Sequence, residues 1–187
     1  MIRIKGFTKI LAVSAFSISM AFTATQVQAG AGHSDGDGHG DKMGIGEPGK
    51  KSEVGRTIEI KMFDNYYEPE EISVKAGETV RFVIKNEGEF VHEFNIGTGA
   101  MHAAHQEEMM MMMEHGALEP DKINHSMMKM DMGNGKTMEH DDPNSVLLEP
   151  GKSDEVVWKF SKAAKLEFAC NVPGHYESGM MGHVRFN

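Results

Sequence analysis

Three side chains with soft or nitrogen donors lie at equal intervals near the C-terminus. Cys170, His175 and Met180 follow one another at steps of five residues. A thiolate, an imidazole and a thioether together prefer copper to magnesium, calcium or manganese, which bind oxygen ligands. A copper site of this kind needs a second imidazole from a distant strand. His92 is the candidate, because it follows a hydrophobic stretch and a turn that contains Gly88.

The same segment resembles a known copper loop. The Cys-x4-His-x4-Met spacing, with Pro173-Gly174 before the histidine and Gly179 before the methionine, is similar to the C-terminal loop of cupredoxins such as rusticyanin and auracyanin. The resemblance extends over residues 56–187, apart from one insertion. It implies one type-1 copper ion with His92, Cys170 and His175 as equatorial ligands and Met180 as the axial ligand. The family pattern places the axial ligand directly after the glycine, which favours Met180 over Met181. By the same resemblance, His175 would be the route for electrons.

One residue departs from the family pattern. Many cupredoxins have Asn or Ser directly after the first histidine, where it helps to hydrogen-bond the two ligand loops, but this chain has Glu93. The favoured interpretation is that Glu93 points to solvent, so that Glu93→Gln would leave the optical spectrum nearly unchanged. The alternative is that Glu93 lies beside the ligands or approaches the copper and alters its potential and colour.

The segments that would position these ligands alternate between apolar and polar residues. This period of two is typical of half-buried strands. It occurs around residues 58–62, 72–74, 80–84, 145–148, 156–160, 166–170 and 183–186. Short alternating strands separated by turns predict an all-β fold, here a Greek-key β-sandwich of the cupredoxin type. Trp158 is expected to pack in its core.

A long insertion interrupts the predicted sandwich at residues 97–144. It holds eleven of the seventeen methionines, together with five histidines. Few other apolar residues accompany them, which argues against a packed core. Thioethers bind Cu(I), and imidazoles bind Cu(I) or Cu(II). The favoured interpretation is a copper-capturing segment; the alternatives are a flexible partner surface and low-complexity sequence without a role. The candidate further copper ligands are Met101, His102, His105, Met109, Met110, Met111, Met112, Met113, His115, His125, Met127, Met128, Met130, Met132, Met138 and His140.

The N-terminal residues are expected to lie outside the fold. Residues 1–29 combine a basic start, an apolar run too short to span a membrane comfortably and small residues before a cleavage site after Ala29, which predicts a signal peptide. An uncleaved anchor is the alternative. Residues 30–55 are rich in Gly, Asp and His and predict a disordered arm. The cupredoxin domain would then span 56–187, and the mature protein would be periplasmic without a stable membrane anchor.

The net charge and the single cysteine limit the kinds of partner that the protein is expected to bind. The formal net charge of −9 at pH 7 argues against nucleic acid. A lone cysteine in an exported protein must pair between chains, react or bind metal, and the surrounding motif selects metal. The expected partners are copper ions and a redox or copper-transfer protein.

Two functions remain open at this point. The first is a periplasmic copper-binding protein for copper homeostasis and tolerance, and the second is a soluble blue-copper electron carrier of a respiratory or photosynthetic chain. An independent enzyme activity is not expected, because the chain has no His-x-His pairs for a further copper cluster and no evident Ser-His-Asp arrangement.

Overall fold

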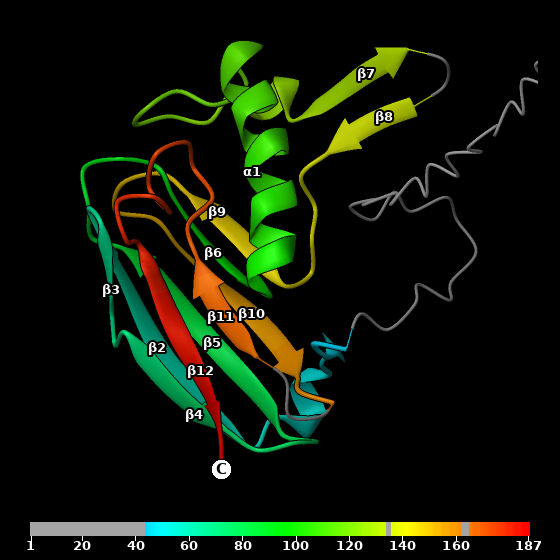
Figure 1. Cartoon of the computed structure of the whole chain (residues 1–187), viewed down its shortest axis with the longest axis vertical. Coiled ribbons are helices and arrows are strands. Elements are labelled where there is room, and N and C mark those ends of the chain that lie inside the picture. The colour runs from blue at the N-terminus through cyan, green and yellow to red at the C-terminus, as the bar shows by residue number, and fades with distance from the viewer. Residues whose placement is uncertain (1–43, 134–135, 162–164) are drawn as a thin grey trace, which may run out of the picture.

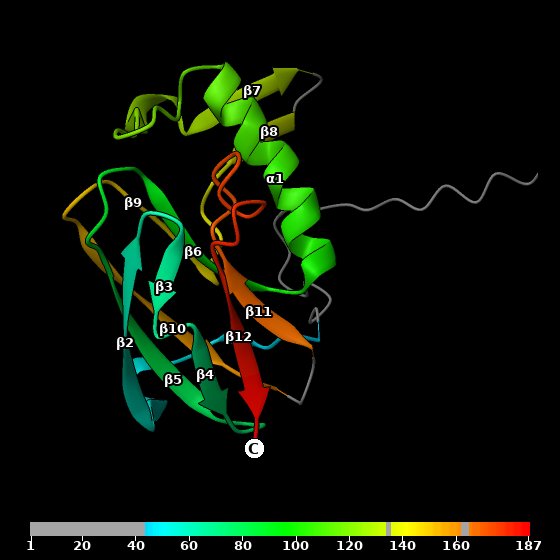
Figure 2. The ribbon, with the colours of Figure 1, turned by 60° about the vertical axis from the view of Figure 1, so that its left-hand side comes forward.

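A computed structural model describes residues 44–133, 136–161 and 165–187. The predicted signal peptide and the first part of the predicted arm lie outside these residues. The described chain forms two five-stranded sheets packed face to face, with one helix and a hairpin at one end (Figures 1 and 2). The predicted β-sandwich is therefore confirmed.

Each sheet mixes parallel and antiparallel neighbours. The first sheet has the order β1 (Glu47–Pro48), β10 (Ser153–Lys159), β5 (Thr79–Asn86), β2 (Arg56–Phe63) and β3 (Tyr66–Glu68). The second sheet has the order β4 (Glu71–Val74), β12 (Met181–Phe186), β11 (Leu166–Ala169), β6 (His92–Gly97) and β9 (Ser145–Leu148). The remaining elements are two 3-10 turns, η1 (Lys51–Glu53) and η2 (His125–Met127), the helix α1 (Gly99–Glu114), and the hairpin of β7 (Lys129–Gly133) and β8 (Lys136–Glu139).

Aromatic side chains fill the space between the sheets. Phe94 of β6 lies 5.4 Å, ring centre to ring centre, from Phe82 of β5 and equally far from Phe168 of β11. Tyr67 is also buried, and its hydroxyl donates a 2.6 Å hydrogen bond to the backbone carbonyl of Glu93. Because β6 is packed and hydrogen-bonded in this way, its first residues are held rigidly against the opposite sheet. Trp158 is buried, as expected.

The ordered domain begins earlier than composition indicated. The composition predicts a disordered arm through residue 55, but β1 pairs with β10, and Ile45 is buried and its carbonyl accepts a hydrogen bond from the indole of Trp158. Gly46 makes this approach possible. Its φ is +134°, and a Cβ there would lie 2.3 Å from the carbonyl oxygen of Lys159. The glycines here serve close packing, which composition does not distinguish from disorder.

The insertion is also more ordered than a loop. Thr98 caps α1 by accepting a hydrogen bond from the amide of Met101. The helix lies beside β6 and β11 at one end of the sandwich (Figures 1 and 2). Its buried residues are His102, His105, Met109 and Met112, spaced so that they share one face. The prediction that the insertion methionines stay out of the core is wrong for Met109 and Met112, which are 0% and 2% exposed.

Among the described residues, none of the helices has both the length and the apolar character needed to cross a bilayer.

Candidate metal centre

Three of the predicted ligands converge between the ends of β6 and β11. The Sγ of Cys170 lies 3.3 Å from Nδ1 of His175 and 4.0 Å from Nδ1 of His92, and the two Nδ1 atoms are 3.2 Å apart. His92 opens β6 and Cys170 directly follows β11, and the two strands pair with Asn95 opposite Ala169. This pairing brings together residues that are 78 positions apart in the chain.

The loop that follows Cys170 turns back on itself. The amide of His175 donates to the carbonyl of Val172, and the amide of Met180 donates to the carbonyl of His175. Gly174 and Gly179 have φ values of +87° and +95°, in the left-handed region that glycine adopts without strain. The turn returns the His175 ring to the thiol from which the loop started.

Burial sets the protonation of this group in the absence of metal. Desolvation raises the pKa of the Cys170 thiol to about 12. Desolvation also lowers the pKa of His92, against the opposing effect of Asp64, and it lowers the pKa of His175, which His92 lowers further. Two neutral imidazoles and a thiol that point at one position suit a cation that accepts lone pairs.

Asp64, which is not among the predicted site residues, orients His92. Its Oδ1 lies 2.8 Å from Nε2 of His92, so a proton on Nε2 leaves Nδ1 free to face Cys170 and His175. A carboxylate behind a ligand histidine is a common way to hold its tautomer and ring orientation. A Cβ at Gly88 would lie 2.4 Å from that Oδ1 and 2.8 Å from Nε2, so the contact requires glycine there. No local pattern around Asp64 marks this role.

Met180 is fully buried, whereas Met181 is partly exposed and begins β12. The amide of Cys170 donates to the carbonyl of Met180 over 3.1 Å, which joins the two ends of the loop. Of the two neighbouring methionines, only Met180 is therefore fully shielded from solvent.

Glu93 does not point to solvent, and the favoured interpretation of this residue is wrong. It is 0% exposed, and its backbone amide donates to the Sγ of Cys170 over 3.3 Å. Its Oε2 accepts hydrogen bonds from the amide and the side chain of Asn171. Glu93 therefore links the segment of His92 to the segment of Cys170 by hydrogen bonds. Asn or Ser has this role at the same position in many cupredoxins.

The other carboxylate oxygen of Glu93 faces the insertion. Its Oε1 lies 2.6 Å from the hydroxyl of Ser145, 2.9 Å from Nε2 of His140 and 3.0 Å from Nε2 of His105. Desolvation would raise the pKa of Glu93, but the charge and hydrogen bonds of His105 and His140 hold it well below its usual value. Desolvation lowers the pKa of His105, but Glu93 and Glu108 outweigh it and raise that pKa to about 10.

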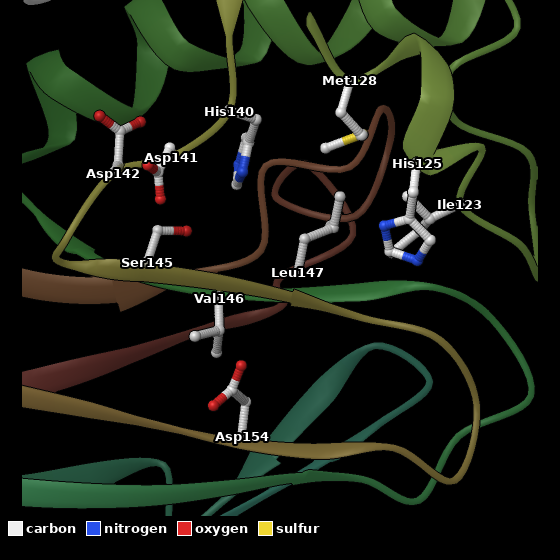
Figure 3. Close-up of a pocket in the computed structure, with 10 residues that line it drawn as sticks. All are labelled: Ile123, His125, Met128, His140, Asp141, Asp142, Ser145, Val146, Leu147 and Asp154. Atoms are coloured by element: carbon white, nitrogen blue, oxygen red, sulfur yellow. The ribbon is translucent and has the colours of Figure 1, made fainter.

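A pocket of about 310 Å³ opens next to His140 (Figure 3). In Figure 3 the His140 ring extends toward the segment that carries Ser145 and Leu147. The wall includes polar and sulfur-bearing side chains from three parts of the insertion and its flanks: His125, Met128, Asp141 and Asp142.

The other candidate ligands of the insertion differ in their exposure to solvent. Met109 and Met112 are buried, as is His102, whose Nδ1 lies 3.2 Å from Nδ2 of Asn171. Met110 and Met127 are 45% and 37% exposed. Of the rest, Met101, Met111, Met113 and Met128 are partly buried, His115 and His125 are exposed, and the side chains of Met130, Met132 and Met138 lie outside the described part of the chain.

Comparison with known proteins gives relatives along most of the chain. Residues 42–102 match the cupredoxin-like domain family. The chain is 52% identical over 146 residues to the copper-resistant cuproprotein CopI of Pseudomonas aeruginosa, covering 75% of this chain and 81% of that protein. It is 38% identical over 171 residues to the protein of the same name from Rubrivivax gelatinosus, covering 88% and 90% respectively.

Solved structures agree on the fold. An auracyanin of Roseiflexus castenholzii aligns with a TM-score of 0.51 and 24% identity, over 72% of this chain and 98% of that one. Auracyanin B aligns with a TM-score of 0.54 and 18% identity, over 76% of this chain and 96% of that one. At these identities the likeness concerns the sandwich alone.

Proposed function

Since the chain belongs to the cupredoxin family of copper-resistant CopI proteins, we propose that it is a copper-binding protein of copper tolerance, with one type-1 copper ion at His92, Cys170, His175 and Met180. One observation carries the site assignment. The Sγ of Cys170 and the Nδ1 atoms of His92 and His175 point at one another, with separations of 3.2 to 4.0 Å. The names of the relatives support tolerance over general electron transport.

The surrounding residues are suited to hold such an ion with little movement. A copper ion in this position supplies reversible one-electron exchange. Asp64 holds the His92 ring, Glu93 donates its amide to the Cys170 sulfur, and the backbone bonds from Met180 to His175 and from Cys170 to Met180 close the loop. Cys170, Met180 and His92 are each 0% exposed, so bulk water is kept from most of the ligand set.

We further propose that the surface of the insertion captures additional Cu(I) in the periplasm. The exposed thioethers of Met110 and Met127 support this, because soft ligands accessible to solvent can receive the soft ion. The signal-peptide pattern of residues 1–29 supports export, and mass spectrometry of the mature protein would test cleavage after Ala29. The function is binding and electron exchange, without turnover of an organic substrate.

An optical titration tests the type-1 assignment. Cu(II) is added to the mature protein and, in parallel, to Cys170→Ser. We expect an intense visible thiolate-to-copper band that saturates at about one ion per chain and is absent from the variant. Copper uptake without such a band in the unaltered protein would contradict the assignment. The chain would then be a Met/His copper binder on a cupredoxin scaffold.

A further inference from the structure

The cluster of Glu93, His105 and His140, of which the first two are buried and the third is partly buried, has the donors of a metal site. We propose that these three residues bind a second metal ion, a divalent transition metal and first of all Cu(II), beside the type-1 site and separate from it. One carboxylate and two imidazoles supply their donor atoms within 4.8 Å of one another. The site extends the copper binding proposed above but does not depend on it, because it uses none of the four type-1 ligands.

The separations are close to those that coordination needs. Nitrogen and oxygen ligands lie about 2.0–2.2 Å from Zn²⁺ in a tetrahedral site, so neighbouring donor atoms are then roughly 3.3–3.6 Å apart. Here Nε2 of His105 and Nε2 of His140 lie 3.0 Å and 2.9 Å from Oε1 of Glu93. Each of these two separations would have to widen by a few tenths of an ångström to admit the ion.

Glu108 prepares His105 for this role. Its Oε2 lies 2.9 Å from Nδ1 of His105, so the ring can keep donating from Nδ1 when Nε2 gives up its proton and turns its lone pair to an ion. Without metal, a proton on Nε2 bridges the 3.0 Å between His105 and Oε1 of Glu93, and a bound ion would take the place of that proton. The carboxylate behind the ligand imidazole repeats the arrangement of Asp64 behind His92.

The carboxylate oxygen is also more crowded than its hydrogen-bonding capacity allows. The Oε1 of Glu93 is approached within 3.0 Å by Ser145, His140 and His105. An oxygen with two lone pairs accepts two good hydrogen bonds, so the third neighbour has no lone pair of its own to bind. A metal ion bound by both imidazoles and Oε1 would resolve this crowding, because the two rings would then direct lone pairs to the ion and no longer compete as donors.

A pocket borders one side of the site. The pocket of about 310 Å³ is lined by His140 and Ser145, the two residues that connect it to Glu93 (Figure 3). Asp141, Asp142 and His125 on the same wall give it negative charge and a further imidazole for a cation in transit. His140 therefore stands between solvent and the buried carboxylate.

The donor set decides the class of ion. Two nitrogens and one carboxylate oxygen, with neither thiolate nor thioether among them, suit divalent ions better than Cu(I). For a given site of this type, Cu(II) binds more tightly than Zn²⁺, which is the nearest competitor. The site would thus hold the oxidised ion, while the exposed thioethers of the insertion favour the reduced one.

A second-equivalent titration tests the proposal. The mature protein is first loaded with Cu(II) until the visible type-1 band saturates, and further Cu(II) is then followed by electron paramagnetic resonance. We expect a second ion with the large hyperfine splitting of a nitrogen- and oxygen-ligated copper and no added intense visible band. His140→Gln is expected to lower the affinity for this second ion by about 100-fold or more, and Glu108→Gln is expected to lower it by about 10-fold. His183→Gln, which alters an exposed histidine of β12 outside the cluster and the pocket, is the matched control and should change the affinity little.

Two results would overturn the proposal: uptake that stops at the type-1 ion, or a second ion bound equally well by His140→Gln. Retention of the visible band in each variant reports that the fold is intact. The same titration on Cys170→Ser separates the two sites, because the second signal should persist there. If the band is missing from the unaltered protein but the second signal is present, the type-1 assignment fails and this site stands.

Discussion

The backbone amide of Glu93 donates a hydrogen bond to the sulfur of Cys170, over 3.3 Å and across 77 positions of the chain. The carboxylate of the same glutamate binds Asn171 with one oxygen and faces His105 and His140 with the other. One buried residue thus joins the predicted copper ligands to the insertion. Changes in the insertion at His105 or His140 can therefore reach the thiolate through a single side chain.

Glu93→Gln is expected to destabilise the metal-free protein by about 1–3 kcal/mol, because an amide cannot replace a buried carboxylate that accepts hydrogen bonds from both sides. The visible band should also shift, since Asn171 next to Cys170 loses its charged partner. Urea denaturation and an optical spectrum measure the two effects. Glu107→Gln, on the exposed side of α1, should stay within about 0.5 kcal/mol of the unaltered protein. An unchanged stability and spectrum in Glu93→Gln would show that the network is not maintained in solution.

Asp64→Ala is expected to weaken copper binding at the type-1 site by about 10- to 100-fold, because His92 loses the partner that fixes its ring. Asp64→Asn should recover most of the affinity, since its carbonyl oxygen can still accept the Nε2 proton. Competition with a chelator, read from the visible band, gives both values. Equal losses in the two variants would mean that charge, not orientation, is what Asp64 contributes.

Copper uptake at the type-1 site should release about one proton per ion near pH 7. The pKa of Cys170 is raised to about 12, so the thiol is protonated there and must lose its proton, whereas the lowered pKa values of His92 and His175 leave both rings neutral. The number of protons released per ion should increase as the pH falls below the imidazole pKa values. The apparent affinity for copper should decrease over the same pH range. A pH indicator in weakly buffered solution measures the protons. Release close to zero at neutral pH, with the visible band at full strength, would mean that the thiol is already ionised.

Replacing Met110 and Met127 together by leucine should lower the uptake of Cu(I) beyond the first ion and leave the type-1 band unchanged. Both thioethers are exposed, and leucine keeps the apolar volume without the sulfur ligand. Met109→Leu is the matched control, because its thioether is buried in the core and should contribute nothing to capture. A chromophoric Cu(I) chelator reports the uptake, and growth in copper tests tolerance. Equal uptake in all three proteins would contradict a capturing role for the exposed methionines.

Local sequence alone determined much of this protein. The apolar alternation predicted the strands of the sandwich, because a strand places successive side chains on opposite faces whatever its partners are. The spacing of Cys170, His175 and Met180 predicted the copper loop, because the three residues lie in one short loop. The glycines of this loop allow the backbone to reverse its direction.

Only the tertiary structure decided the surroundings of Glu93. Pairing of β6 with β9 brings Ser145 to its carboxylate, and packing of α1 against β6 brings His105 there. Asp64 reaches His92 across 28 positions, and Met109 is buried because α1 has a partner. These contacts join segments far apart in the chain, so no local pattern records them. Their energies arise from burial and pairing, which exist only after the sheets and the helix have packed.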